Sequence, residues 1–234
     1  MVGSPKEVMG KEAWMELAKF GIIEPVDTSK PTLWTSALHL QSKPSGGLRP
    51  CGDFRQLNAR TELDKYPLPH LQKWTHKLAG AKVFSKCDIR KAYHHIEVEK
   101  SHRHKTAVTT PWGVWQFVKM PMGLANASQS YQRYMNSLLQ GVEGVYCYLD
   151  DLLLYSDNEE SHLQIVDKVF KILSEAGLSL ALDKCQFGQS SLEFLGYKVD
   201  ESGITPLDKK VSAINNFPEP NKQKELLGFR QQKC

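Results

Sequence analysis

The sequence predicts an α+β fold in which helices cover one face of an antiparallel sheet. Between residues 83 and 182, segments with strand and helix patterns follow one another in the order strand, helix, hairpin, helix, strand. Glycine and proline mark the turns between the short apolar runs. A chain of 234 residues, 41% of them hydrophobic, can bury a core of its own. We therefore expect one domain, or one domain with a smaller lobe.

The N-terminal part is expected to form a helix followed by a hairpin. The helix covers residues 6–20 and is closed by Gly21, because its apolar residues recur at helical spacing. These residues are Ala13, Trp14, Leu17 and Ala18. Residues 36–40 and 48–53 favour strands, and the proline and glycines of residues 43–47 favour the turn between them.

A short helix, a strand and a second hairpin are expected next. Pro67 and Pro69 interrupt the chain before the helix. The apolar residues of that helix are Leu71, Trp74 and Leu78. Residues 83–87 favour a strand that ends at Asp88, and residues 106–117 favour a hairpin around Pro111-Trp112-Gly113.

Two amphipathic helices are expected on either side of a central hairpin in the sequence. One helix ends before Gly141 and the other ends at Gly177. Their apolar faces consist of Tyr131, Met135, Leu138 and Leu139, and of Leu163, Val166, Phe170 and Leu173. Strands over residues 178–182 and 192–199 follow, and Thr205-Pro206 opens a last helix with Val211 and Ile214 facing inward.

Composition excludes few classes of protein. The formal net charge of +4 is compatible with a polyanionic partner without establishing one. No apolar run approaches the roughly 18 residues that a membrane span needs, and the N-terminus lacks the apolar region of a signal peptide. We expect no membrane partner and an intracellular protein, with cytoplasm and nucleus both open. The five cysteines form no C-x-x-C pair, which favours reduced thiols.

The central hairpin carries two adjacent acids. Tyr148-Leu149-Asp150-Asp151 lies between the apolar runs 144–147 and 152–155. Ionised carboxylates beside buried strands are costly unless a cation neutralises them. Magnesium is the expected cation, because it is a hard ion that prefers carboxylate oxygen.

Asp88 is a third candidate ligand, at the end of its own predicted strand and 62 residues before Asp150 (150 minus 88). Neighbouring strands lie about 4.8 Å apart. Carboxylates at the ends of such strands could share two divalent ions, the arrangement that serves in-line phosphoryl displacement. We therefore expect two Mg²⁺ ions, with Mn²⁺ as a substitute, at Asp88, Asp150 and Asp151.

Several motifs in order resemble the pol polyprotein of gypsy-type LTR retrotransposons, and specifically its reverse transcriptase. The motifs are RPCGDFRQLN (49–58), YPLP (66–69), FSKCD (84–88), AYH (92–94), MPMGL (120–124), YLDD (148–151), KCQFG (184–188) and FLG (194–196). The resemblance extends from about residue 21 to about residue 226. It implies an RNA-directed DNA polymerase, a nucleotidyltransferase that adds dNTPs to a primer on an RNA or DNA template.

The resemblance implies a right-hand polymerase with three parts. Residues 1–81 would be the N-terminal part of the fingers, and residues 82–205 an antiparallel, ferredoxin-like palm with a fingers insertion around residues 95–121. Residues 206–234 would begin a thumb that is truncated, because the motif starting at Lys224 stops at Cys234. Whether the chain is cut from a larger polyprotein stays open, as does its oligomeric state.

The resemblance also implies roles for single residues. Asp88 and Asp150 would be the main metal ligands and Asp151 a supporting acid. Tyr93, five residues after Asp88, would be the steric gate that excludes a 2′-hydroxyl. The incoming dNTP would meet Lys43, Arg49, Tyr93, Met122 and Lys184, and the primer end would be positioned by Leu195 and Gly196. Met122 departs from the phenylalanine usual in this transposon family, which changes the expected shape of the nucleotide pocket.

Three other readings stay open. The truncated thumb favours a transposon-derived remnant that binds nucleic acid without processive synthesis. An RNA-templated RNA polymerase or a nucleotidyl cyclase would share the paired acids, although Tyr93 argues against both. A purely structural protein is the last alternative, since Asp-Asp is also a common turn dipeptide.

Overall fold

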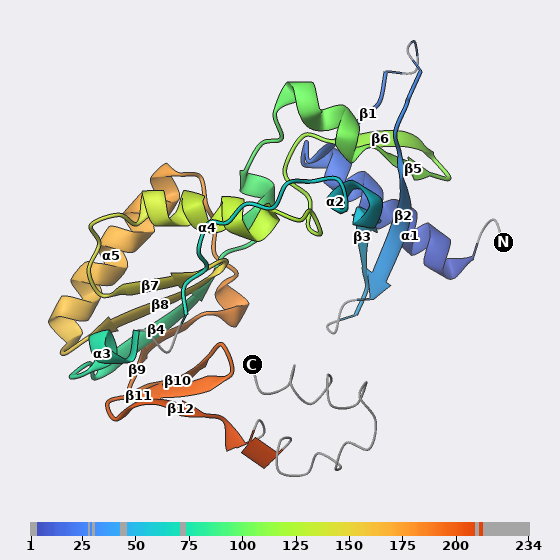
Figure 1. Cartoon of the computed structure of the whole chain (residues 1–234). Coiled ribbons are helices and arrows are strands. Elements are labelled where there is room, and N and C mark those ends of the chain that lie inside the picture. The colour runs from blue at the N-terminus through green and yellow to red at the C-terminus, as the bar shows by residue number, and fades with distance from the viewer. Residues whose placement is uncertain are drawn as a thin grey trace, which may run out of the picture. The chain divides into compact units, whose positions relative to one another are not determined.

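The computed structural model describes residues 4–27, 29, 31–42, 46–70, 74–208 and 211–212. Its contacts divide the chain into two compact units, and Figure 1 shows their elements. The first unit contains Met1–Leu68 and Arg90–Leu138, and the second contains Pro69–Ile89 and Leu139–Cys234. Among the helices within the described residues, none is long and apolar enough to cross a membrane.

The first unit is built on a five-stranded sheet with the strand order β1-β6-β5-β2-β3. β2 and β5 pair in parallel, and the other neighbours pair antiparallel. Its elements are α1 (Pro5–Lys19), β1 (Ile23–Pro25), β2 (Ser36–Ser42), β3 (Leu48–Gly52), α2 (Arg55–Asn58), the 3₁₀ helices η2 (Ala92–His95) and η3 (Lys100–Thr106), β5 (Val108–Thr110), β6 (Gly113–Phe117) and α4 (Ala127–Leu138). The predicted first helix and both predicted hairpins are confirmed, whereas β1 and α2 were not predicted.

Aromatic residues fill the core of this unit. The rings of Trp14 and Phe117 meet edge to face with centroids 5.9 Å apart, and Phe54 meets Phe117 in the same way at 6.1 Å. All three residues are buried. This packing fastens α1 to the sheet, and the Ser4 side chain, which accepts from the amide of Glu7, caps its first turn.

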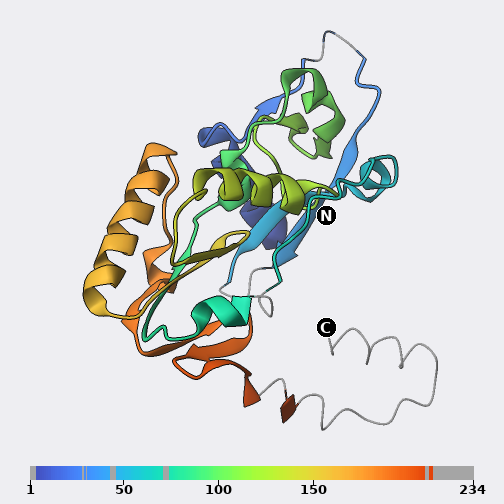
Figure 2. The same ribbon diagram turned by 60° about the vertical axis from the view of Figure 1, so that its left-hand side comes forward.

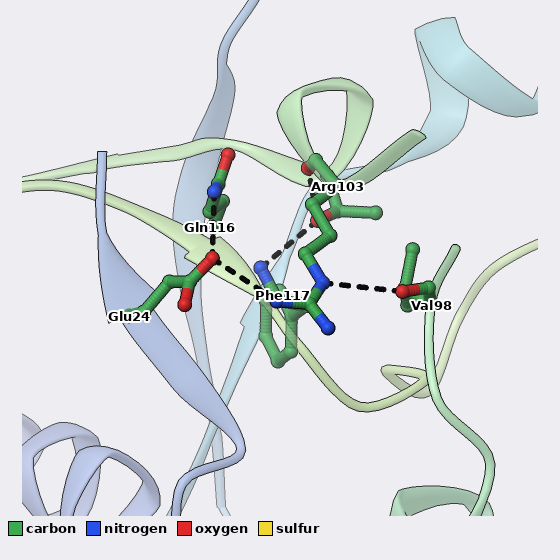
Figure 3. A network of polar contacts seen from close by, with 6 residues as sticks. Glu24, Val98, Arg103, Gln116 and Phe117 are labelled. Carbon is green, nitrogen blue, oxygen red and sulfur yellow. Dashed lines mark hydrogen bonds and ion pairs between the residues drawn. The ribbon is translucent and has the colours of Figure 1, made fainter. Parts of the chain in front are cut away.

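A polar network holds η3 against the sheet of the first unit (Figure 3). Glu24 Oε1 accepts a hydrogen bond from Gln116 Nε2 at 2.8 Å and lies 3.5 Å from Arg103 Nη1. Thr106 Oγ1 donates to the carbonyl of Arg103 at 2.7 Å and accepts from the amide of Phe117 at 2.9 Å. The buried Thr106 hydroxyl therefore joins the end of η3 to the end of β6.

The second unit contains two sheets. A four-stranded antiparallel sheet has the order β7-β8-β4-β9, and a three-stranded antiparallel sheet has the order β10-β11-β12. The elements are α3 (Thr75–Leu78), β4 (Val83–Asp88), β7 (Val145–Tyr148), β8 (Asp151–Ser156), α5 (Glu159–Glu175), η4 (Leu182–Lys184), β9 (Gln186–Gln189), β10 (Ser191–Phe194), β11 (Tyr197–Asp200) and β12 (Gly203–Pro206). These elements confirm the α+β class and the central hairpin.

The two faces of β4 have different neighbours. Phe84 packs with Leu192 and Phe194 of the three-stranded sheet, so this face of the four-stranded sheet is covered by β strands. Ser85, one residue further, faces α5 and contacts its buried His162. The long helix α5 lies along the sheet in both views of the ribbon (Figure 1, Figure 2). The alternation places Lys86 and Asp88 on the face of Phe84.

A directed chain of buried hydrogen bonds anchors α5. The Ser156 hydroxyl donates to the carbonyl of Asn158 at 2.9 Å, so it can only accept from His162 Nδ1, at 3.0 Å. Burial lowers the pKa of His162 and so favours the neutral ring, in which Nε2 accepts from the Ser85 hydroxyl at 2.7 Å. Ser85 Oγ in turn accepts from the amide of Gly188 at 3.0 Å. We therefore assign His162 as neutral, with its proton on Nδ1.

The structure corrects three predictions for the C-terminal part. Residues 178–182 form no strand: only Leu180 makes a bridge, to Ile89, before η4 turns the chain. The predicted strand 192–199 is a hairpin, because Leu195 and Gly196 turn with φ of 49° and 77°.

The last predicted helix also begins later than expected, because Thr205 and Pro206 still pair with β11. Val211 is 42% exposed rather than inward. Ile214 and most of the expected start of the thumb lie outside the described residues.

Candidate active site

The three predicted acids of the second unit lie at one edge of the four-stranded sheet. β4 ends at Asp88 and β8 begins at Asp151, and the two residues are direct partners in the antiparallel pairing. The amide of Ile89 donates to the carbonyl of Asp150 at 2.9 Å, which fastens the hairpin turn to the end of β4. Partners on adjacent strands have Cα atoms roughly 4.5–5.5 Å apart. The sheet therefore brings Asp88 and the Asp150-Asp151 pair together, as predicted.

The turn that presents these acids is strained. Leu149 has φ of 54°, in the left-handed region that side chains other than glycine rarely adopt. Within the part of the chain that the structure describes, the other such residues are Lys91, near Tyr93, and Leu195 in the FLG motif. A residue in this conformation costs of order 1–2 kcal/mol. Strain of this kind is typical of functional sites, and here it accompanies three of the motifs found in the sequence.

Two lysines neutralise part of the negative charge. Lys184 Nζ, in η4, lies 3.3 Å from Asp88 Oδ2, and Lys86 Nζ lies 3.7 Å from Asp151 Oδ1. Burial is the main cause that raises the pKa of Asp151, and the neighbouring carboxylates of Asp150 and Asp88 raise it further. The two lysines act in the opposite direction. The edge is thus a small acidic cluster with its own counter-charges.

The donor atoms of this edge suit a hard divalent cation. Carboxylate oxygens are the ligands that Mg²⁺ prefers, and a cation here would neutralise the negative charges of Asp88 and Asp150 beside Asp151. Among the described residues, however, no group of three or more His, Cys, Asp or Glu side chains is already arranged around one point. Lysine ammonium groups supply positive charge there instead.

The predicted primer-positioning residues form the turn between β10 and β11. Leu195 and Gly196 both have positive φ, and the Leu195 side chain packs against the core that Phe84 and Tyr146 share with this sheet. The turn is therefore tied to β4 and β7 through the hydrophobic core, in the same unit as the acids.

The remaining predicted residues belong to the first unit. Tyr93 lies in η2, where its hydroxyl is 3.4 Å from Ser128 Oγ and its ring centroid is 5.4 Å from that of Tyr131. Arg49 is exposed on β3, and Met122 is 39% exposed just before Gly123. Lys43 lies outside the described residues.

Lys86 is a site residue that the sequence reasoning missed. It precedes Asp88 by two positions on β4, and strand alternation places both side chains on one face. That spacing was visible in the sequence. The partner of Lys86 was not, because the contact with Asp151 depends on the register between β4 and β8.

Solved structures show which fold the chain has. The foamy viral protease-reverse transcriptase dRH in complex with ds DNA superposes with a TM-score of 0.86 at 23% identity, covering 98% of this chain and 40% of that chain. The foamy viral protease-reverse transcriptase in complex with RNA/DNA hybrid superposes with a TM-score of 0.82 at 22% identity, covering 99% of this chain and 31% of that chain. This chain therefore has the fingers and palm fold of a right-hand polymerase.

The sequence comparisons then give the family. The protein-family model described as "Reverse transcriptase (RNA-dependent DNA polymerase)" matches residues 41–199, so the chain belongs to the reverse transcriptase family. The retrovirus-related Pol polyprotein from transposon 297 of Drosophila melanogaster is 38% identical over 179 residues, which are 76% of this chain and 17% of that protein. The transposon Tf2-3 polyprotein of Schizosaccharomyces pombe is 35% identical over 189 residues, 80% of this chain and 14% of that protein.

These relatives confirm the predicted kinship with LTR retrotransposon pol polyproteins. The chain spans less than a fifth of the length of either polyprotein.

Proposed function

We propose that this chain is the core of an RNA-directed DNA polymerase that adds dNTPs to the 3′-hydroxyl of a primer. One observation carries the proposal: Asp88 and Asp151 are direct strand partners, with Asp150 fastened beside them at the same sheet edge. Membership of the reverse transcriptase family and the strained YLDD turn support it.

The reaction is an in-line displacement at the α-phosphorus of the dNTP. The primer 3′-oxygen forms the new P–O bond, pyrophosphate leaves, and the hydroxyl proton is released. Asp88 and Asp150 are the proposed ligands of two Mg²⁺ ions, for which Mn²⁺ can substitute, and Asp151 is the supporting acid. When bound, these ions would stabilise charge on the attacking and leaving oxygens. Lys184, 3.3 Å from Asp88, is placed to exchange that contact for a triphosphate oxygen.

The first unit supplies the proposed nucleotide contacts. Arg49 offers a guanidinium fork and Lys43 a point charge to the triphosphate. Tyr93, held between Ser128 and Tyr131, is the proposed gate against a 2′-hydroxyl, and Met122 would line the nucleotide pocket.

The proposed partners are an RNA or DNA template with its primer. Foamy viral enzymes of the same fold are described in complexes with ds DNA and with RNA/DNA hybrid. We assign residues 1–81 to the fingers, 82–205 to the palm with its insertion around 95–121, and 206–234 to the start of the thumb. Leu195 and Gly196 are proposed to position the primer end.

Primer extension with the purified chain tests this function. An RNA template with a labelled DNA primer and dNTPs should give extended product with Mg²⁺ or Mn²⁺, and Asp150→Asn should abolish it. Asp167→Asn is the matched control, because Asp167 is an exposed acid on α5 of the same unit. The control should extend primers as the wild type does.

Two outcomes would contradict the proposal. Extension that survives Asp150→Asn would show that the acids do not perform the reaction. Salt-dependent binding of the duplex without any extension in either metal would instead favour the nucleic-acid-binding remnant.

A further inference from the structure

Two cysteines lie opposite each other beside the candidate active site. In the pairing of β4 with β9, Lys86 is the partner of Gln186. Continuing this antiparallel register by one residue places Cys87 opposite Cys185, whose backbone is extended. The strand pairing stops at this position, because Lys184 belongs to η4 and the amide of Ala181 donates to the carbonyl of Asp88. Cys87 and Cys185 therefore lie opposite each other at the last position where β4 and β9 run side by side.

The geometry of such a pair suits a disulfide. Directly opposed residues of antiparallel strands have Cα atoms about 4.5–5.5 Å apart, which falls within the roughly 4.4–6.8 Å that disulfides span. Their side chains also point to the same side of the sheet.

The two thiols differ in access. Cys87 is completely buried, whereas Cys185 is half-buried and donates from Sγ to the carbonyl of Ala181 at 3.3 Å. A reagent from solution would therefore meet Cys185 first, with Cys87 behind it. An accessible attacking thiol backed by a second, buried thiol is the arrangement that thiol-disulfide exchange requires.

We propose that Cys87 and Cys185 form a redox-active dithiol that small-molecule disulfides, such as oxidised glutathione, convert into an intramolecular disulfide. The Cys185 thiolate attacks one sulfur of the reagent, forming a mixed disulfide and releasing one glutathione thiolate. The Cys87 thiolate then attacks the Cys185 sulfur and releases the second. The protein loses two electrons and two protons, and the reagent becomes two molecules of reduced glutathione.

The disulfide would join two strands at the point where the candidate site is built. Each cysteine is the immediate neighbour of a charged site residue, Cys87 of Asp88 and Cys185 of Lys184. Cross-linking would fix the end of β4 to the start of β9 and hold the end of η4, with Lys184, beside Asp88. The disulfide can form whether or not the chain is a polymerase. Any effect of the disulfide on primer extension rests on the proposed polymerase function.

Mass spectrometry of the full chain tests the proposal. After incubation with oxidised glutathione and blocking of the remaining thiols, proteolysis should yield a peptide containing Cys87 linked to one containing Cys185. Before proteolysis the intact mass should show the loss of two hydrogen atoms, with two of the five thiols unavailable to the blocking reagent. Reduction by dithiothreitol should restore all five.

Variants make the test specific. Cys185→Ser should abolish the linked peptide, and Cys51→Ser, a change in the first unit, should leave its yield unchanged. A glutathione adduct on Cys185 with no link to Cys87, or links to other cysteines in equal yield, would overturn the proposal. Circular dichroism of each variant shows that it is folded.

Primer extension forms a separate arm. If the proposed polymerase function holds, oxidation should lower the extension rate of the wild type, dithiothreitol should restore it, and Cys185→Ser should be insensitive. A linked peptide in a chain that never extends primers would contradict the polymerase function and leave the dithiol standing. Primer extension by a chain that never forms the disulfide would support the polymerase function and contradict the redox-active dithiol.

Discussion

Replacement of Ser85 by alanine should strongly destabilise the second unit. Ser85 is fully buried and makes two hydrogen bonds, donating to His162 at 2.7 Å and accepting from the amide of Gly188 at 3.0 Å. Each buried hydrogen bond contributes about 1 kcal/mol net, and each partner left without one costs more. We expect Ser85→Ala to lower the free energy of unfolding by about 2–4 kcal/mol.

Urea unfolding at pH 8, followed by far-ultraviolet circular dichroism, measures this change as a shift of the midpoint at constant slope. Ser191→Ala is the matched control, because Ser191 is an exposed serine on β10, and its effect should stay within about 0.5 kcal/mol. If Ser85→Ala falls within the same range as the control, the hydrogen-bond chain does not hold α5 to the sheet.

The pH dependence tests the assigned proton. Burial lowers the pKa of His162 below its ordinary 6.5, so just below pH 6.5 the unfolded chain binds more protons than the folded one. The contribution of neutral His162 to the free energy of unfolding is fully present above pH 6.5. It is lost as the pH falls from 6.5 through the lowered pKa of the folded state. His162→Gln should flatten this loss by up to about 1.4 kcal/mol per pH unit. Burial also lowers the pKa of His94, but His94 is present in both the wild type and His162→Gln. If the two proteins lose stability with pH at the same slope, the assignment of His162 as neutral is refuted.

Three further predictions concern packing, hydrogen bonding and nucleotide choice. Gly144→Ala should destabilise the second unit by at least about 1 kcal/mol more than Gly141→Ala. Both glycines have φ of +75°, so the backbone strain is the same in the two variants. Only at position 144 would the new Cβ clash, because it would lie 2.5 Å from Ile165 Cδ1. Chemical denaturation of both variants measures the difference, and equal losses would count against the clash. Thr106→Val keeps the shape of the side chain but removes two hydrogen bonds, so unfolding should be easier by about 1–3 kcal/mol, and a change below about 0.5 kcal/mol would contradict the network. Tyr93→Ala should relax the preference for dNTPs over rNTPs by roughly 10- to 200-fold, as steady-state incorporation kinetics would show, and unchanged discrimination would argue against the gate.

The sequence was sufficient for the acidic edge because strong local patterns surround it. Apolar runs on both sides of Asp150-Asp151 predict a buried hairpin, and the run ending at Asp88 predicts a strand that ends in an acid. The antiparallel pairing of Asp88 with Asp151 then follows from the hairpin lying beside that strand.

Other features depend on contacts that no local pattern encodes. The strand expected over 192–199 is broken because Leu195 adopts a left-handed conformation, which packing against the core of the second unit maintains at a non-glycine residue. β1 is only three residues long and exists because β6 pairs with it. Likewise, the contact of Lys86 with Asp151 and the position of Cys87 opposite Cys185 require the register of β4 with β8 and β9.

The buried leucines of β8 determine more than stability. Leu152, Leu153 and Leu154 are all completely buried, so this strand is enclosed on both faces immediately after Asp151. Sliding β8 by one residue along β4 would turn every side chain to the opposite face and drive a carboxylate into the layer beneath α5. Hydrocarbon packing thus sets the alignment of the charged groups, and a buried leucine one to three residues after Asp151 can alter chemistry without touching any reactant.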